Sequence, residues 1–323
     1  TLFPYTTLFR SNTTSLMAAA SAEGLTPART MRLAESLYMD GYISYPRVDN
    51  TVYPSSLDLA DTVKKIMGNP AYTPYCKQLL SGGPLHATRG KKETTDHPPI
   101  YPTAMATPDN LPAAEYKLYN LIARRFLATL SDAAIVEGTK VSLVVGGEEF
   151  VAKGDVLVKP GFRGIYPYGL KKDEQLPALE EGQDIAFNGA TCTKDQTKPP
   201  ARYSQGRLIQ EMEKLGLGTK STRHSIIERL YTVKYVQNDP IEPSQLGMAV
   251  CDALDKFAPH ITHPQMTAEL EEEMDNIAEG QKTKTEVVTN SRNLLSEQLA
   301  SLLPHSEEVK DALADAVAAD AYV

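Results

Sequence analysis

Three side chains with complementary chemistry, Tyr45, Arg47 and Asp49, stand at alternate positions of one short stretch. Residues 42–45 have the composition of a strand, and alternate side chains of a strand project from one face. A tyrosine hydroxyl is a weak nucleophile at neutral pH, but a neighbouring guanidinium can stabilise the charge of a phosphate under attack. The stretch therefore suggests covalent attack of Tyr45 on a phosphate ester. An ordinary Arg–Asp ion pair beside a tyrosine-rich strand end would contain the same residues.

A second candidate, His97, lies near the end of a polar loop at residues 81–99 and is followed by two prolines and Ile100. A histidine on such a rigid and poorly solvated segment can hydrogen-bond a phosphate or shuttle a proton. A single histidine is more often structural or solvated, so this residue does not decide the chemistry by itself.

The third candidate is a basic block at residues 198–235, which carries eight Lys and Arg residues against three Asp and Glu residues. Lys220, Ser221 and Thr222 stand at the start of a helical pattern in this block. Hydroxyls, backbone N–H groups and a flanking cation at a helix start can hold a phosphate. A simple helix cap would need only Ser221 or Thr219.

Two segments that must position these residues, Thr26–Ile43 and Thr219–Val236, align with each other without gaps. The Thr-Pro pair that opens the first segment is typical of a helix start, and Gly41 is typical of a turn beyond a helix end. Each copy is predicted to be a helix followed by a short strand, as in winged-helix and helix-turn-helix modules that contact nucleic acids. Chance similarity over so short a segment is the alternative.

The rest of the chain combines helical and strand-like patterns. The expected helices are 13–23, 57–67, 113–130, 206–215, 221–231, 244–258 and 264–280, and the expected strands are 140–145, 149–153 and 184–187. The acidic run Glu269–Asp275 indicates a solvated helix face, because consecutive carboxylates point around the helix axis. These elements predict an α+β, multidomain fold.

Composition limits the possible functions without choosing one. A length of 323 residues allows two or three domains. The net charge of −8 argues by itself against nucleic-acid binding, but the acids concentrate late in the chain and leave the block at 198–235 basic. The sequence contains no run of about 18 apolar residues, the length that would be needed to span a membrane. The three cysteines are far apart, which favours buried free thiols over a zinc ribbon or disulfides.

Taken in order, these motifs resemble those of the type IA DNA topoisomerases over roughly residues 12–300. Tyr45-x-Arg47 resembles the nucleophile motif of that family, and the residues from His97 to Thr103 resemble its His-x-x-Ile-x-Pro-Thr element. The basic block resembles its DNA-gripping domain. Many members of the family have Arg-Pro where this chain has Thr219-Lys220, and the form found here resembles the archaeal branch. Whether Thr219 makes the same DNA contact is left open.

The resemblance implies two helical, winged-helix or catabolite-activator-like domains joined by a β-rich hinge domain. On this sequence the expected parts are a catalytic-tyrosine domain at 12–130, a hinge or gate at 131–198, a gripping domain at 199–300 and an acidic, Ala-rich tail at 301–323. Residues 1–11 match a frame translation of a sequencing adapter and are interpreted as an artefact.

The resemblance also implies a role for each matching residue. Tyr45 would attack a single-strand phosphodiester and become linked to the 5′ phosphate, and the DNA 3′ hydroxyl would reverse the reaction without ATP. Arg47 would steady the phosphate, His97 would contact or protonate nearby groups, and Asp49 would orient Arg47 or the Tyr45 strand. Contacts to the backbone of single-stranded DNA would come from Arg202, Ser204, Gln205, Lys220, Ser221 and Thr222.

In the complete enzyme these steps would allow strand passage and relaxation of negative supercoils. The family's Toprim domain, which supplies a catalytic Glu and an acidic Mg²⁺ cluster, is expected to precede this region, whose sequence suggests no metal site. Mg²⁺ is therefore expected for the complete enzyme, and this fragment alone is expected to bind DNA without relaxing supercoils. The expected partners are DNA and the Toprim domain of the same polypeptide. The complete enzyme is expected to be a monomer that is cytoplasmic and associated with the nucleoid.

Two other interpretations stay open. The first is a non-catalytic DNA-binding module built on paired winged helices, in which Tyr45 is structural. The second is a tyrosine recombinase, which is less well supported because its cluster of separate Arg and His residues near a late Tyr does not appear.

Overall fold

The computed structural model describes residues 2–5, 11–169 and 174–321, and the chain divides into two compact units. The first unit comprises residues 1–10, 51–93 and 101–201, and the second comprises residues 11–50, 94–100 and 202–323. The short segment at 94–100 is therefore grouped with parts of the chain that are distant from it in sequence.

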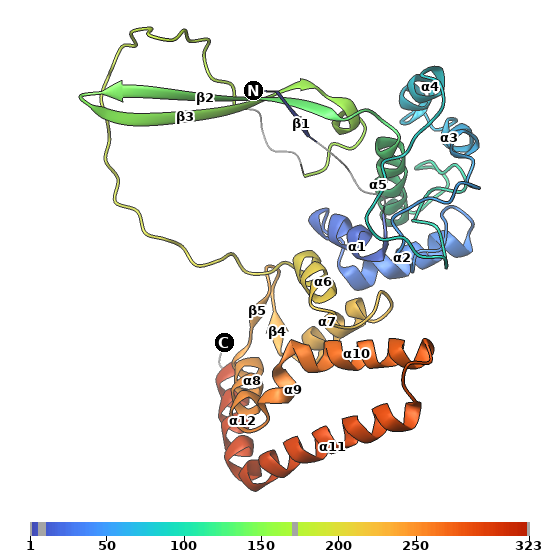
Figure 1. Ribbon diagram of the computed structural model, residues 1–323, viewed down its shortest axis with the longest axis vertical. Helices are drawn as coiled ribbons and strands as arrows, with labels where there is room; N and C mark the ends of the chain where they lie inside the picture. The colour runs from blue at the N-terminus through green and yellow to red at the C-terminus, as the bar shows by residue number, and fades with distance from the viewer. Residues whose placement is uncertain (1, 6–10, 170–173, 322–323) are drawn as a thin grey trace. The chain divides into compact units, whose positions relative to one another are not determined.

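The α-helices of the first unit, within the described residues, are α3 (Leu59–Ile66), α4 (Thr73–Ser81) and α5 (Ala113–Thr129) (Figure 1). α3 and α5 confirm the helices predicted at 57–67 and 113–130, whereas α4 was not predicted. Leu118, Ile122 and Phe126 recur at helical spacing on α5 and are at most 1% exposed, so this helix supplies much of the apolar core of the unit.

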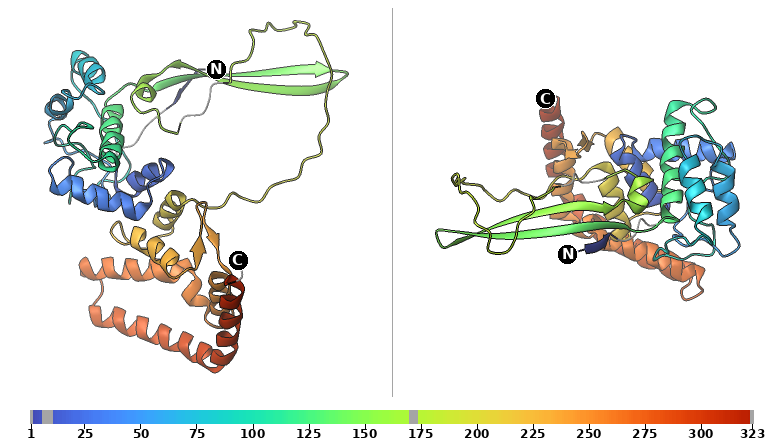
Figure 2. Two further views of the ribbon diagram at one scale, coloured as in Figure 1. Left: turned by 180° about the vertical axis from the view of Figure 1, so that it is seen from behind. Right: turned by 90° about the horizontal axis from the view of Figure 1, so that it is seen from above.

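The sheet of the first unit is a long antiparallel hairpin with a short strand at one edge. β2 (Ala134–Val145) pairs with β3 (Glu148–Lys159), and β1 (Leu2–Tyr5) pairs with the start of β2. The hairpin turns at Gly146 and Gly147, whose φ angles of 61° and 89° suit a two-residue hairpin turn. Both views of Figure 2 show the two strands extended side by side. The strands predicted at 140–145 and 149–153 are confirmed.

Beyond the hairpin, residues 174–204 are mostly exposed and form no regular secondary structure. The strand predicted at 184–187 is therefore wrong. An alternating pattern yields a strand only where a neighbouring strand accepts and donates its hydrogen bonds, and none pairs with this segment in the described structure. The prediction of buried thiols holds for Cys76 alone, since Cys192 and Cys251 are exposed.

In the second unit, two pairs of helices from distant parts of the chain share one small core. The first pair is α1 (Thr13–Ala22) and α2 (Pro27–Met39), and the second is α6 (Gln205–Lys214) and α7 (Arg223–Thr232). All four helices contribute to the cluster of Met17, Met31, Ile209, Met212 and Ile227. α6 approaches α1 closely at Gly206, because a side-chain carbon there would come within 2.8 Å of Ser21.

The two predicted copies of the helix–turn unit end in the same way. Gly41 after α2 has φ of 80°, and Lys234, the aligned residue after α7, has φ of 60°. The following N–H groups both reach back to the last helical turn, from Tyr42 to the Leu37 carbonyl (2.8 Å) and from Tyr235 to the Leu230 carbonyl (2.9 Å). Only the second copy continues into a hairpin within the described structure, formed by β4 (Val236–Gln237) and β5 (Glu242–Pro243).

The strand predicted at residues 42–45 is wrong, because Tyr42 and Ser44 lie in bends and Ile43 forms only an isolated bridge in the part of the chain that the structure describes. The side chain of Thr13, at the start of α1, hydrogen-bonds the backbone just beyond this segment, at Pro46 and Val48. Its Oγ1 lies 2.8 Å from the Pro46 carbonyl and accepts a hydrogen bond from the Val48 N–H (2.7 Å). The Thr13 N–H donates in turn to the Val48 carbonyl (2.9 Å).

The C-terminal part of the second unit is helical. It contains α8 (Gln245–Phe257), α9 (Pro259–Thr262), α10 (Pro264–Ala278), α11 (Lys284–Leu302) and α12 (Ser306–Asp320). α8 and α10 confirm predicted helices, whereas α11 and α12 were not predicted. The Asp320 carboxylate accepts hydrogen bonds from the first N–H groups of α8 and so ties the last helix to it. No helix among the described residues is long and apolar enough to cross a membrane.

Candidate active site around Tyr45

Burial alternates along the extended segment that follows α2. Ser44, Val48 and Asn50 are at most 8% exposed, and Pro46 is also buried. The side chains between these residues are partly exposed. These partly exposed residues are Tyr45, Arg47 and Asp49. The predicted alternation is therefore present, although it is produced by an extended chain packed against α1 and not by a strand.

Two aromatic side chains flank the Tyr45 ring. The His97 ring lies with its centroid 4.7 Å from that of Tyr45 at an interplanar angle of 48°, and the Tyr38 ring of α2 lies 5.3 Å away at 73°. The structure therefore brings the two strongest sequence candidates, Tyr45 and His97, into contact. Tyr38 was not singled out from the sequence, although its position in the last turn of α2 was a signal.

The segment that carries His97 is fastened to the Tyr45 segment by its backbone. The Asn50 side-chain amide donates to the carbonyls of Thr94 (2.8 Å) and His97 (3.1 Å). At the other end of the segment, the Ile100 N–H donates to the Ser11 carbonyl (2.8 Å). These bonds hold the exposed His97 ring beside Tyr45 without using the imidazole itself.

Arg47 is held by a carboxylate of α2 that the sequence analysis did not predict. Its Nε and Nη2 both donate to Glu35 Oε1, with an Nε to Oε1 distance of 2.8 Å. Its Nη1 donates to the Ser221 carbonyl (3.2 Å), which connects it to the start of α7. The role predicted for Asp49, to orient Arg47 or Tyr45, stays a prediction.

A second ion pair joins the basic block to the segment of His97. Lys220 Nζ lies 2.7 Å from Asp96 Oδ2, and the two side chains are 28% and 37% exposed. The hydrogen bond from Lys220, assisted by one from Thr94, holds the pKa of the Asp96 carboxyl well below its ordinary value. Asp96 therefore stays ionised at any pH near neutrality. Its position directly before His97 was the available signal in the sequence.

The turn before α7 is organised by its own hydroxyls. The Ser221 N–H donates to Thr219 Oγ1 (3.2 Å), and the Thr219 N–H donates to Thr222 Oγ1 (2.9 Å). Thr222 is the cap residue of α7, but its side chain makes no capping hydrogen bond to that helix. The simple cap by Ser221 or Thr219, which was the alternative interpretation, is therefore not what the structure contains.

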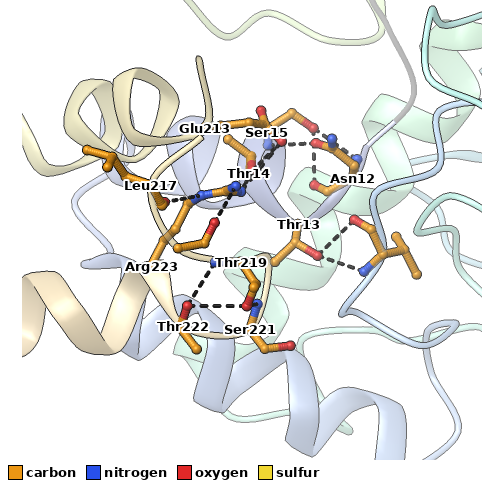
Figure 3. A network of polar contacts seen from close by, with 12 residues as sticks. Asn12, Thr13, Thr14, Ser15, Glu213, Leu217, Thr219, Ser221, Thr222 and Arg223 are labelled. Atoms are coloured by element: carbon orange, nitrogen blue, oxygen red, sulfur yellow. Dashed lines mark hydrogen bonds and ion pairs between the residues drawn. The ribbon is translucent and has the colours of Figure 1, made fainter. Parts of the chain in front are cut away.

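Arg223, which is only 7% exposed, binds the backbone directly before this turn (Figure 3). Its Nε donates to the Leu217 carbonyl (3.0 Å) and its Nη2 to the Gly218 carbonyl (2.8 Å). Glu213 of α6 lies 3.7 Å from its Nη1 and also accepts a hydrogen bond from Thr14 of α1 (3.0 Å). The turn that presents Lys220 is consequently tied to both α1 and α6.

His224, on the first turn of α7, is a further titratable group of this region that sequence reasoning missed. Its Nδ1 is buried and has no hydrogen-bond partner among the described residues. Burial, followed by the nearby positive charge of Arg47, lowers the pKa of this imidazole. The neutral form is therefore favoured beside the pair of Arg47 and Glu35.

Known proteins match this chain over most of its length. A family model described as DNA topoisomerase matches residues 4–289. DNA topoisomerase 1 of Archaeoglobus fulgidus is 43% identical over 291 residues, which cover 90% of this chain and 43% of that protein. DNA topoisomerase 1 of Thermoplasma acidophilum is 41% identical over 301 residues, which cover 93% of this chain and 39% of that protein.

The chain belongs to the type IA DNA topoisomerase family. It is also 32% identical over 288 residues to human DNA topoisomerase 3-alpha, with 88% of this chain and 29% of that protein covered. The full-length topoisomerase I of Thermotoga maritima shares the fold, with a TM-score of 0.71, 24% identity and coverage of 92% of this chain and 50% of that chain. The chain thus spans half or less of the length of these topoisomerases.

The other predicted DNA contacts of this topoisomerase chain lie at the start of α6. Ser204 caps α6 by accepting from the Arg207 N–H (3.3 Å), the Gln205 N–H donates to Asp239 (3.3 Å), and Arg202 lies 3.8 Å from Glu242. Among the contacts of the described residues, none joins Arg202, Ser204 or Gln205 to Tyr45. They form a second group, beside the hairpin of β4 and β5.

The acidic residues of the described chain do not form a metal site. No group of three or more His, Cys, Asp or Glu side chains among the described residues is placed to hold a metal ion. The run Glu269–Asp275 lies on α10 with its side chains spread between exposed and partly exposed positions. Since these residues do not fit Mg²⁺, no step of the topoisomerase reaction is assigned to an ion held by them.

Proposed function

We propose that this chain is the part of a type IA topoisomerase that cleaves and rejoins one DNA strand through Tyr45. The supporting observation is the contact of the Tyr45 ring with His97. Two cations belong to the same region: Arg47 donates to the Ser221 carbonyl, and Lys220, the residue before Ser221, pairs with Asp96, the residue before His97. A nucleophile, a proton carrier and phosphate-binding cations are the groups that a transesterification of DNA needs.

In the proposed cleavage step, Tyr45 Oη gives up its proton and forms a bond to the phosphorus of a phosphodiester. The bond from phosphorus to the 3′ oxygen breaks, and that oxygen leaves with a proton as the 3′ hydroxyl. The tyrosine is then esterified to the 5′ phosphate. Rejoining is the same exchange in reverse, with the 3′ hydroxyl as the attacking group. The phosphodiester is conserved as an ester at each stage, so no ATP is consumed.

The roles of the surrounding residues follow from where they lie. Arg47, which is partly exposed, would bind the scissile phosphate and the phosphotyrosine. His97 would contact the phosphate or transfer a proton at Tyr45 or at the leaving oxygen. Asp49, on the same side of the extended segment, would orient Arg47 or the segment itself.

Grip on single-stranded DNA is proposed for the two groups of polar residues in the basic block. The Thr219–Thr222 turn would offer Lys220, Ser221 and Thr222, and the start of α6 would offer Arg202, Ser204 and Gln205. The order of α6, α7 and the β4–β5 hairpin is that of a winged-helix module, which supports this assignment. Because phosphate contacts release counterions, affinity for DNA should fall steeply with salt.

The wider activity of the complete protein is part of the proposal. Strand passage and relaxation of negative supercoils would need a Toprim domain with Mg²⁺ in addition to the residues described above. We propose that the complete enzyme acts as a monomer on cytoplasmic DNA. The proposed domain limits at residues 130 and 198 and the artefactual origin of residues 1–11 likewise stay predictions.

A covalent trapping assay tests the function. A single-stranded oligonucleotide labelled at the end that stays on the protein is incubated with this chain, supplied with a Toprim domain and Mg²⁺, and the denatured product is separated on a gel. The adduct should form with the unchanged sequence and with Tyr38→Phe, and should be lost with Tyr45→Phe. An adduct that survives Tyr45→Phe refutes the assignment. DNA binding without any adduct would instead support the non-catalytic DNA-binding module.

A further inference from the structure

Arg47 and Lys220 are each paired with a carboxylate. Glu35 accepts two hydrogen bonds from Arg47, and Asp96 accepts one from Lys220 at 2.7 Å. Glu35 comes from α2, and Asp96 comes from the segment of His97. In both pairs the acid was absent from the set of residues that the sequence suggested for DNA contact.

The two ion pairs belong to one closed series of contacts. The Arg47 guanidinium reaches the carbonyl of Ser221, the neighbour of Lys220 (3.2 Å). Lys220 reaches Asp96, the neighbour of His97, and the His97 ring lies on Tyr45, two residues from Arg47. An anion that bound Arg47 or Lys220 would therefore break an ion pair in the same series of contacts as Tyr45 and His97.

The backbone that carries these carboxylates has other anchors as well. The segment of His97 is already fastened by Asn50, through the carbonyls of Thr94 and His97. α2 is anchored by Met31, Ala34 and Leu37, each at most 1% exposed. Partly exposed ion pairs contribute little net stability, so the fold should survive the loss of either acid.

The chemistry of the two acids points to competition with DNA. A carboxylate and a phosphate accept hydrogen bonds from guanidinium and ammonium groups in similar geometry. The side chains of Glu35 and Asp96 are 42% and 37% exposed, so solvent and an incoming anion can reach them. While they hold the cations, they also cancel much of the positive field that would attract a DNA strand.

We propose that Glu35 and Asp96 are internal substitutes for DNA phosphates, which occupy Arg47 and Lys220 until a phosphodiester of single-stranded DNA displaces them. This inference rests on the proposed function. The two acids thereby lower the affinity for DNA and restrict engagement of Arg47 and Lys220 to a strand that supplies phosphates at both positions. Exchange at Lys220 also releases Asp96, the residue that directly precedes His97.

The experiment measures binding of a fluorescent oligothymidine by the chain at several KCl concentrations. Asp96→Asn should bind about three- to tenfold more tightly at low salt, which is the range expected for removing a partly exposed ionic competitor. Glu35→Gln should shift affinity in the same direction. Glu211→Gln is the matched control, because it removes the same charge from the Lys214–Glu211 pair of α6, which lies outside this series of contacts. It should change the affinity for the oligonucleotide far less.

The double variant Asp96→Asn/Lys220→Ala separates competition from a general charge effect. It should bind like Lys220→Ala alone, because no cation is left for Asp96 to occupy. Affinity of Asp96→Asn no higher than that of Glu211→Gln, or a gain that persists without Lys220, would overturn the inference while leaving DNA binding intact. Failure of the unchanged chain to bind the oligonucleotide would instead overturn the proposed DNA grip and the inference together. Circular dichroism confirms that each variant is folded.

Discussion

The rings of Tyr45 and His97 lie with their centroids 4.7 Å apart, although the chain between them passes through the other compact unit at residues 51–93. The contact is maintained by the Asn50 side chain, which hydrogen-bonds the carbonyls of Thr94 and His97. The imidazole nitrogens are not used in these anchoring bonds. His97 is therefore placed at the proposed nucleophile with its proton-carrying atoms available for chemistry.

We expect His97→Gln to slow covalent cleavage about 100-fold, as the loss of a general acid or base commonly does. Affinity for single-stranded DNA should change much less, because the anchors of the segment are backbone carbonyls and glutamine keeps a hydrogen-bond donor for the phosphate. The rate is measured in a single turnover with the trapping assay described above. His263→Gln, at an exposed histidine before α10, is the matched control. Normal cleavage by His97→Gln would remove this residue from the mechanism.

Thr13→Val should destabilise the second unit and disturb Tyr45 at the same time. Thr13 is fully buried, and its Oγ1 accepts the Val48 N–H and lies 2.8 Å from the Pro46 carbonyl. Valine has a similar shape but leaves these backbone groups unsatisfied, which costs about 1–3 kcal/mol of unfolding free energy. Urea unfolding measures the loss, and covalent cleavage should fall in parallel.

Thr62→Val in α3 is the comparison for Thr13→Val. Thr62 is equally buried, but its Oγ1 hydrogen bond goes to Asp58, a carbonyl of the preceding helical turn. The loss of that local bond should have a smaller effect on stability and none on cleavage. Equal effects of the two substitutions would show that Thr13 has no special role in supporting the Tyr45 segment.

Arg223→Met should reduce the unfolding free energy by about 3 kcal/mol, because it removes charged hydrogen bonds to two partly buried carbonyls and leaves Glu213 without its cation. The two carbonyls belong to Leu217 and Gly218 in the turn that presents Lys220. DNA affinity should also fall when measured well below the melting temperature. Arg229→Met, at an exposed position of the same helix, should alter neither quantity appreciably.

The lowered pKa of His224 predicts a loss of stability in mild acid. An unfolded histidine takes up its proton near pH 6.5, whereas the folded protein keeps this imidazole neutral to lower pH. The unfolded state therefore binds more protons below about pH 6.5, so the unfolding free energy decreases as the pH falls through that range. The charges that act on His224 are those of Arg47, Glu35, Glu228 and Arg32.

Urea unfolding at pH 7.5 and pH 5.5 measures this effect. His224→Gln should lose part of the decrease in stability seen with the unchanged sequence between these two pH values. His263→Gln should keep the full decrease, because His263 is exposed. An identical pH dependence in His224→Gln and the unchanged sequence would show that His224 does not contribute to it.

Much of the local structure could be read from the sequence, because its causes are local. The Thr26-Pro27 start of α2, the positive φ of Gly41 and the apolar spacing of α5 depend on neighbouring residues along the chain. The alternation of Tyr45, Arg47 and Asp49 was predictable for the same reason. α12 was missed because its Ala-rich sequence has a helical propensity without an apolar stripe.

Only the tertiary structure decided which groups surround Tyr45. The backbone just beyond Tyr45 is bonded by Thr13, from a different element, at Pro46 and Val48. The pairs Glu35–Arg47 and Asp96–Lys220 arise because α1, α2, α6 and α7 pack around one apolar core and bring distant segments together. Motifs in the sequence indicated the family and the proposed nucleophile. Ion pairs between distant segments, in contrast, depend on apolar packing, which is non-directional. Such packing leaves no periodic pattern in the sequence around the charged residues that it brings together.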